Sequence, residues 1–129
     1  MKRNLLTFFL MGLLLTVNPA VLNAQPEVEW QQTYGGEDED QAMDAFQTED
    51  GGYLVVGYDE LFGQVEWDGW IVKTDENGDS LWSREYGGDA SDFLFYGMEL
   101  DGGDFVFSGR TQSLGNDEEF WLVKTDNEG

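Results

Sequence analysis

Apolar residues in the main part of the chain occur in short continuous runs. These runs are three to four residues long, and turns rich in Gly, Asp and Asn occur between them. They are found at residues 53–56, 70–72, 105–107 and 121–123. A strand with one face in water alternates apolar and polar residues, so continuous runs predict strands that are covered on both faces. Helical periodicity is absent after the N-terminal segment, and we expect an all-β fold.

The same pattern occurs twice along the sequence. Trp82 lies 52 positions after Trp30, and Trp121 lies 51 positions after Trp70. A period of this size is typical of propellers, solenoids and related repeat arrays. In the first unit, turn signals separate four expected strands, at residues 41–48, 52–58, 67–74 and 79–86. A further expected strand at 28–34 has the sequence pattern of the fourth one.

Glycine-rich turns separate these strands. Asp50-Gly51-Gly52 and Asp101-Gly102-Gly103 supply residues that tolerate positive φ between the first two strands of each unit. Residues 75–78 form a tight return between the last two strands. The stretch 103–109 has one residue more than 52–57, which predicts a bulge or an altered turn in the second unit.

These strands predict antiparallel four-stranded blades of the propeller type. Each blade of a β-propeller is packed between its neighbours, so its strands lose their polar face. We expect two repeats, a partial propeller, with unit 1 at about residues 37–88 and unit 2 at about 89–129. Strand 28–34 is expected to complete unit 2.

Two blades cannot enclose a ring, because propellers have roughly four to eight. Three explanations stay open. The chain is the first part of a longer protein, or several copies build a ring head to tail, or the two sheets form a monomer. In the first two cases the missing blades come from a longer chain or from other copies.

The repeat resembles a known family. The residues that carry the resemblance are Tyr34-Gly-Gly, Asp40, the stretches 50–58 and 68–78, and Trp82. They look like the β-propeller repeat of secreted bacterial proteins, over residues 27–129. Such repeats occur mostly in large surface or secreted proteins of undefined role. The resemblance therefore implies a fold and a setting, and it implies no catalytic residues.

The N-terminus has the pattern of a secretory signal peptide. A basic start precedes an apolar run from Leu5 to Val17, and small residues follow up to Ala24, the expected cleavage position, with Ala20 as the alternative. The run is shorter than the roughly 20 residues that span a bilayer. We expect a signal peptide at 1–24, a repeat domain at 25–129 and no membrane insertion after signal removal. The protein is then secreted to the cell surface, the medium or the periplasm.

Charge and composition exclude several functions. The chain has 27 acidic and 6 basic residues, a formal net charge of −21, and neither Cys nor His. Such a charge repels phosphate backbones and anionic membranes, so we expect no nucleic-acid partner. Thiol, imidazole and Cys/His zinc chemistry are excluded. Lys73 and Lys124 recur in phase, which predicts a charge pair within each unit.

An acidic turn is the first candidate metal site. Asp75, Asn77 and Asp79 place oxygen ligands at positions 1, 3 and 5 of a calcium loop. Ser80 stands where such a loop has Gly, and Tyr86 stands where it has a bidentate Glu. A plain hairpin turn is the competing interpretation. We expect no resident cofactor, with calcium as the open alternative.

A second acidic cluster occupies residues 37–40. Asp38 and Asp40 are its candidate cation ligands, since adjacent carboxylates repel one another unless a cation or water screens them. Asp40 recurs as Asp92, which also suits a side chain that hydrogen-bonds to the backbone of a turn.

Aromatic residues offer a candidate ligand site. Four of the five Trp residues recur in phase, where packing between sheets explains them. Trp67 has no aromatic counterpart, because Glu118 stands at its repeat position. Trp67, and after it Phe62, are therefore the candidates for contact with a carbohydrate or protein ligand.

The sequence thus favours a secreted, non-catalytic repeat module with a structural or binding role, as the N-terminal part of a longer propeller protein. One alternative is a fragment of a propeller-based enzyme of the hydrolase or quinone-dependent type. Glycoside hydrolysis needs only two carboxylates, but 27 acidic residues offer too many pairings to single one out. The other alternative is a calcium-dependent adhesion module.

Overall fold

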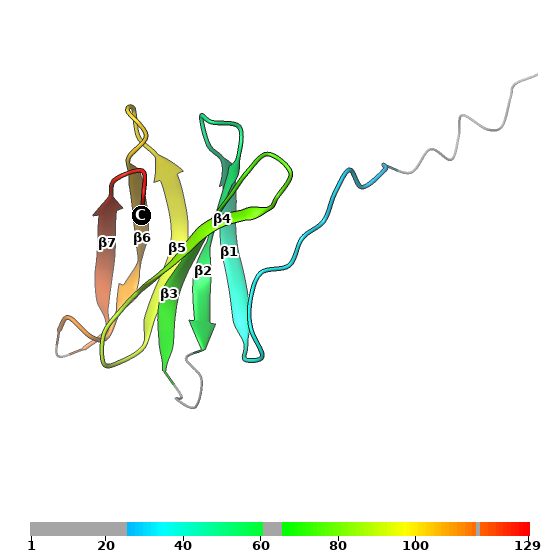
Figure 1. The fold of residues 1–129 in the computed structure, drawn as a ribbon. Coiled ribbons are helices and arrows are strands. Elements are labelled where there is room, and N and C mark those ends of the chain that lie inside the picture. The colour runs from blue at the N-terminus through cyan, green and yellow to red at the C-terminus, as the bar shows by residue number, and fades with distance from the viewer. Residues whose placement is uncertain (1–25, 61–65, 116) are drawn as a thin grey trace, which may run out of the picture.

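A computed structural model describes residues 26–60, 66–115 and 117–129. In these ranges the chain forms seven strands and no helix (Figure 1). The strands are β1 (Asp40–Gln47), β2 (Tyr53–Glu60), β3 (Trp67–Thr74), β4 (Ser80–Tyr86), β5 (Asp92–Glu99), β6 (Phe105–Thr111) and β7 (Glu119–Thr125). The described part of the chain therefore contains no helix long and apolar enough to cross a membrane. The expected signal peptide lies outside the described residues.

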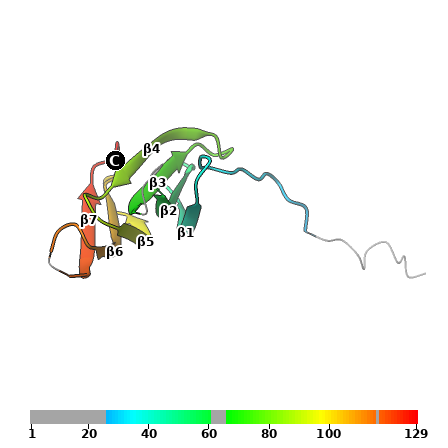
Figure 2. The ribbon, with the colours of Figure 1, turned by 90° about the horizontal axis from the view of Figure 1, so that it is seen from below.

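The strands form two antiparallel sheets. The first sheet has the order β1-β2-β3-β4, and the second has the order β5-β6-β7. Figure 2 shows the two sheets stacked beside each other, with β4 reaching across toward the second sheet. The all-β prediction is confirmed, and the four strands expected in the first unit agree with β1 to β4 within two residues at each end. The two sheets do not close into a ring.

The segment 28–34 is not a strand, contrary to expectation. It lies on the first sheet, where the Trp30 and Tyr53 rings meet edge to face at 5.3 Å. The Tyr34 hydroxyl donates a 2.7 Å hydrogen bond to the Gly78 carbonyl. In Figure 1 this segment and β7 lie on opposite sides of the molecule, so it cannot complete the second sheet of its own chain.

Both units contain the same bulge. The ladder between the first two strands of each sheet shifts at Met43 and at Phe95. Gly57 and Gly109 lie beside these bulges, where an added Cβ would come within 1.9 Å of a carbonyl oxygen. The glycine that the sequence repeats at this position is therefore required by close approach of the neighbouring backbone.

The turn between the first two strands is altered in the second unit, as expected, but its length is the same. The turns 48–52 and 100–104 are closed by equivalent backbone hydrogen bonds. Gly51 alone has positive φ in the first turn, whereas Gly102 and Gly103 both have it in the second.

The core lies between the two sheets. The first sheet contributes Leu54, Val56 and Ile71, and the second contributes Leu94, Phe105 and Phe107. All six are 2 % exposed or less. The continuous apolar runs are therefore only partly explained by burial between the sheets, since alternate residues of each run point away from this core.

Candidate functional site

The strand ladders define which residues of the two sheets correspond. Gly57 pairs with Trp70 in the first sheet, and Gly109 pairs with Trp121 in the second. Each residue of β1 or β2 therefore corresponds to the residue 52 positions later, and each residue of β3 to the residue 51 positions later. This correspondence allows the two sheets to be compared face by face.

We call the side of the first sheet that packs on the second its inner face. It includes Asp44, Phe46, Gly69 and Ile71. Ile71 is fully buried, and an added Cβ on Gly69 would lie 2.7 Å from Leu94 of the second sheet. The inner face is thus covered by its neighbour.

The same positions of the second sheet are uncovered. They are occupied by Tyr96, Met98, Phe120 and Leu122, which we call the open face. Their exposed fractions are 67 %, 56 %, 104 % and 72 %. Four neighbouring positions that hold an acid, a glycine and two apolar residues in the first sheet thus hold four large apolar or aromatic side chains here.

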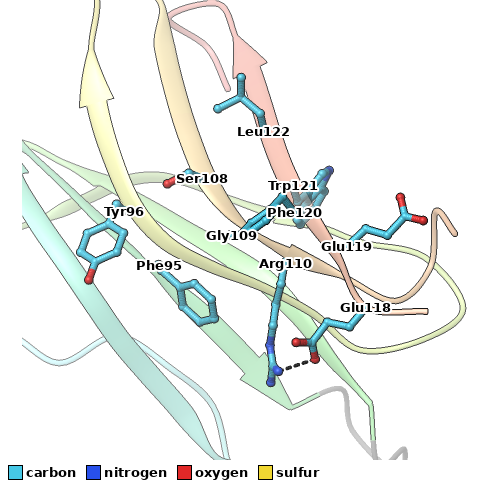
Figure 3. A pocket seen from close by; sticks show the side chains of 10 residues that line it. All are labelled: Phe95, Tyr96, Ser108, Gly109, Arg110, Glu118, Glu119, Phe120, Trp121 and Leu122. Atoms are coloured by element: carbon cyan, nitrogen blue, oxygen red, sulfur yellow. Dashed lines mark hydrogen bonds and ion pairs between the residues drawn. The ribbon is translucent and has the colours of Figure 1, made fainter.

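A broad hollow follows the open face. It has a volume of about 1040 Å³ and is lined by residues of β5, β6 and β7 with the loop before β7 (Figure 3). Arg110 and Glu118 form an ion pair at one end of it. The Arg110 guanidinium also lies 4.3 Å from the centre of the Phe93 ring, a cation–π contact. The hollow is therefore apolar with a charged rim, as interaction surfaces commonly are.

The opposite side of the first sheet, its outer face, carries Tyr53, Val55 and Trp70. All three are half-buried. They correspond to Phe105, Phe107 and Trp121, which face the first sheet from the second. The segment 28–34 covers part of the outer face and leaves a hollow of about 360 Å³ lined by Tyr34, Val55 and Trp70, among others.

The acidic turn that holds the candidate calcium ligands is a hairpin turn, the competing interpretation of its sequence. Asp75 Oδ1 accepts hydrogen bonds of 2.9 Å from the backbone N–H groups of Asn77 and Asp79. The ladder continues directly into β4 after this turn. Among the described residues no group of three or more acidic side chains is arranged to hold a metal ion. The calcium alternative stays a prediction.

The candidate ligands of the second acidic cluster, Asp38 and Asp40, lie in the loop before β1 and at its first residue. Asp38 is exposed. Asp40 Oδ2 accepts a 3.0 Å hydrogen bond from the Gly36 N–H, and Asp92 Oδ2 accepts a 2.9 Å bond from the Gly88 N–H. This is the turn-stabilising hydrogen bond that the recurrence of Asp40 and Asp92 predicts.

Trp67 lies at the start of β3, in an aromatic cluster between the sheets. Its ring meets Tyr58 edge to face at 5.4 Å and lies over Phe93 at 6.5 Å. Two of these three rings come from the first sheet and one from the second, and packing accounts for Trp67. Its contact with a ligand stays a prediction, and Phe62 lies outside the described residues.

Two half-buried carboxyl groups face each other across β2 and β3. Asp59 and Asp68 are ladder partners, and each has one buried side-chain oxygen without a hydrogen-bond partner among the described residues. Burial, together with repulsion from neighbouring carboxylates, raises the pKa of each to about 6. The main repelling groups are Glu85 and Asp40 for Asp59, and Asp92 and Glu85 for Asp68. These groups carry an electrostatic cost at neutral pH.

The open face was missed by reasoning from sequence. Leu122 belongs to the run 121–123, which was assigned to burial on both sides, and Tyr96, Met98 and Phe120 lie outside the assigned runs. A signal was present, because Phe120 and Tyr96 stand where the first unit has Gly69 and Asp44. Large apolar residues at positions that are small or polar in the other unit indicate a change of neighbour.

Comparison with known proteins adds no assignment. No protein-family model matches the sequence, and no curated protein matches it. The functional argument is therefore carried by the geometry of the two sheets.

Proposed function

We propose that the chain is a secreted, non-catalytic repeat module whose two sheets are consecutive propeller-type blades, with a structural or binding role at or outside the cell surface. The open face carries this proposal. Its four exposed side chains stand at positions that are used for packing in the first sheet.

The direction of stacking supports the proposal. The inner face of the first sheet meets the side of the second sheet that carries Phe105 and Phe107. The corresponding side of the first sheet is its outer face. Each sheet thus offers one kind of face to its predecessor and the other kind to its successor, and such a stack can be extended by further units.

A partner for the open face is favoured by the hydrophobic effect. Apolar side chains left in water at adjacent positions mark interaction sites more often than isolated ones do. Covering them contributes roughly 25 cal/mol for each Å² of apolar surface removed from water. The partner that matches this surface is another β-sheet or an apolar ligand.

Substitution of the open face tests the proposal. Leu122→Lys should change the free energy of unfolding by less than about 0.5 kcal/mol, because the side chain is exposed. It should also reduce the fluorescence of a dye that binds apolar surface. The matched change at the corresponding buried position, Ile71→Lys, should unfold the protein.

A large loss of stability in Leu122→Lys would contradict the proposal, because it would place the open face in the folding core. Unchanged dye binding together with unchanged stability would also contradict it, since the exposed face would then not be the accessible apolar surface.

A further inference from the structure

The segment 28–34 contacts the first sheet in the way that β4 contacts the second. The Trp82 ring of β4 lies 6.4 Å from the ring of Phe105. The Trp30 ring lies 5.3 Å from that of Tyr53. Tyr53 and Phe105 correspond in the two sheets, and Trp30 and Trp82 are 52 positions apart.

The hairpin glycines repeat this arrangement. A Cβ on Gly129 would lie 3.0 Å from the Trp82 ring, and a Cβ on Gly78 would lie 2.8 Å from the Trp30 ring. Two tryptophans thus pack on two equivalent turns of consecutive sheets. The segment 28–34 therefore has the position of a β4-type strand that belongs to a sheet preceding the first one.

Such a strand is shared between two sheets. The backbone of β4 pairs with β3 in the first sheet, while its Trp82 and Tyr86 rings lie against Phe105 and Phe107 of the second. The segment 28–34 makes the second kind of contact, but within the described residues it has no strand partner. The outer edge of β7 likewise has no strand partner there.

We infer that residues 28–34 of one copy pair with β7 of a second copy, complete its second sheet as a fourth strand, and bring the outer face of the first copy onto the open face of the second. This inference rests on the proposed stacking of sheets. The occupant of the open face is then the first sheet of another copy.

The β3–β4 ladder fixes the register of this pairing. Ile71 pairs with Arg84 and Val72 with Ser83. Each β3 residue corresponds to the β7 residue 51 positions later, and each β4 residue corresponds to the residue 52 positions earlier in the segment 28–34. The expected pairs between copies are therefore Phe120 with Tyr34, Trp121 with Thr33, Leu122 with Gln32, Val123 with Gln31 and Lys124 with Trp30.

Charge is compatible with this pairing. Within the segment 28–34 only Glu29 is charged at neutral pH, although the chain has a net charge of −21. The small number of charges in this segment limits local repulsion, while repulsion between the remaining surfaces is screened by salt within about 8–10 Å. Association should therefore strengthen with ionic strength.

The two surfaces differ, so the contact is heterologous. Contacts of this kind form rings where the rotation closes and open filaments where it does not. With two sheets in each copy, a ring of four to eight sheets takes roughly two to four copies.

The first test is the mass of the purified chain by light scattering at rising protein and salt concentration. We expect masses of two or more copies, and the loss of these species in Leu122→Lys. Leu114→Lys is the matched control, because Leu114 is also exposed but lies in the loop before β7. It should keep the assembly. A monomer under all conditions, or equal effects of both substitutions, overturns the inference.

The second test fixes the register with introduced cysteines, since the chain has none. Opposed residues of antiparallel strands have Cα atoms roughly 4.5–5.5 Å apart, within the range of a disulfide. Gln32→Cys with Leu122→Cys should give oxidised dimers and larger species on a non-reducing gel. Gln31→Cys with Leu122→Cys places one thiol on the other side of the strand and should cross-link far less.

Association with equal cross-linking of both pairs overturns the strand pairing, because the copies would then meet by another surface. Failure of separate copies to associate would contradict this inference without contradicting the proposed function. If separate copies stay monomeric but covalently joined copies stabilise one another, the proposed stacking of sheets stands, and the inference that a separate second copy occupies the open face is overturned.

Discussion

At the scale of residues, the two lysines that recur in the repeat differ in burial and therefore in their expected contribution to stability. Lys73 is almost fully buried and donates hydrogen bonds of 3.0 and 2.9 Å to the Asp50 carboxylate. Lys124 pairs with Asp104 and is more than half exposed. The prediction of a charge pair in each unit is confirmed. The acidic partner comes from a different position of the turn in each unit, because Gly102 stands at the position of Asp50 and Asp104 stands at the position of Gly52.

Asp50→Ala should destabilise the protein by roughly 1–3 kcal/mol, because it leaves the buried Lys73 ammonium with the Thr74 carbonyl as its remaining acceptor. Asp104→Ala, at the exposed pair, should cost less than about 1 kcal/mol. Urea unfolding of the two variants compares them. An equal loss in the free energy of unfolding for both variants would contradict the argument that the buried lysine depends more on its partner.

Acid sensitivity follows from the same pair. Hydrogen bonds from Thr48 and Lys73 lower the pKa of Asp50 to about 2. A carboxyl group whose pKa is lowered in the folded state contributes stability above its unfolded pKa and loses it as pH falls through the folded value. This contribution is therefore complete at pH 5 and disappears between about pH 4 and 2.

Asp59 and Asp68 act in the opposite direction. Their raised pKa values, about 6, mean that the folded state binds protons more tightly than the unfolded chain. Their contribution to stability is present below pH 4 and is lost as pH rises through 6. Asp59→Asn should raise the melting temperature at pH 7 and reduce the difference between pH 5 and pH 7.

The control for this experiment is Asp101→Asn, which removes the same charge from an exposed turn. It should leave the difference between the two pH values close to that of the parent chain. If both variants change it equally, net charge rather than the buried pair governs the pH dependence.

At the scale of elements, sequence reasoning located the strands but could not decide their neighbours. The strands β1 to β4 follow from turn residues and apolar runs, which are local signals. The segment 28–34 has the sequence of such a strand, yet it forms no ladder, because pairing depends on a partner edge that its own chain places on the far side. The open face was missed for the same reason.

Elements of the two sheets pack closely at Gly97. An added Cβ on Gly97 would lie 2.9 Å from each of Phe46, Val56 and Phe107. Gly97→Ala should therefore destabilise the protein by about 1–3 kcal/mol through overpacking. Thermal unfolding should show no comparable loss for Gly36→Ala, where an added Cβ meets no atom within 4 Å.

At the scale of the whole molecule, the two sheets form a directional stack with a different surface at each end. One end is the outer face, partly covered by residues 28–34, and the other is the open face with the unpaired edge of β7. The candidate metal and ligand residues that the structure describes lie in turns and in packing contacts. The open face is recognised only when corresponding positions of the two sheets are compared in space.

The repeat offsets also specify how a further unit would be joined. Gly129 corresponds to Gly78, and Glu27 corresponds to Asp79, the residue that follows Gly78. A second copy that starts at Glu27 and follows Gly129 directly therefore continues the repeat in phase. In such a tandem chain the segment 28–34 of the second copy would follow the last turn as β4 follows Gly78.

The melting temperature of this tandem chain tests the stacking most directly. Burial of the open face at the junction should raise it by at least about 5 °C over the single chain, the shift that roughly 1 kcal/mol produces in a small domain. Leu122→Lys in the first copy should remove the gain. A tandem chain that melts at the temperature of the single chain would contradict the account.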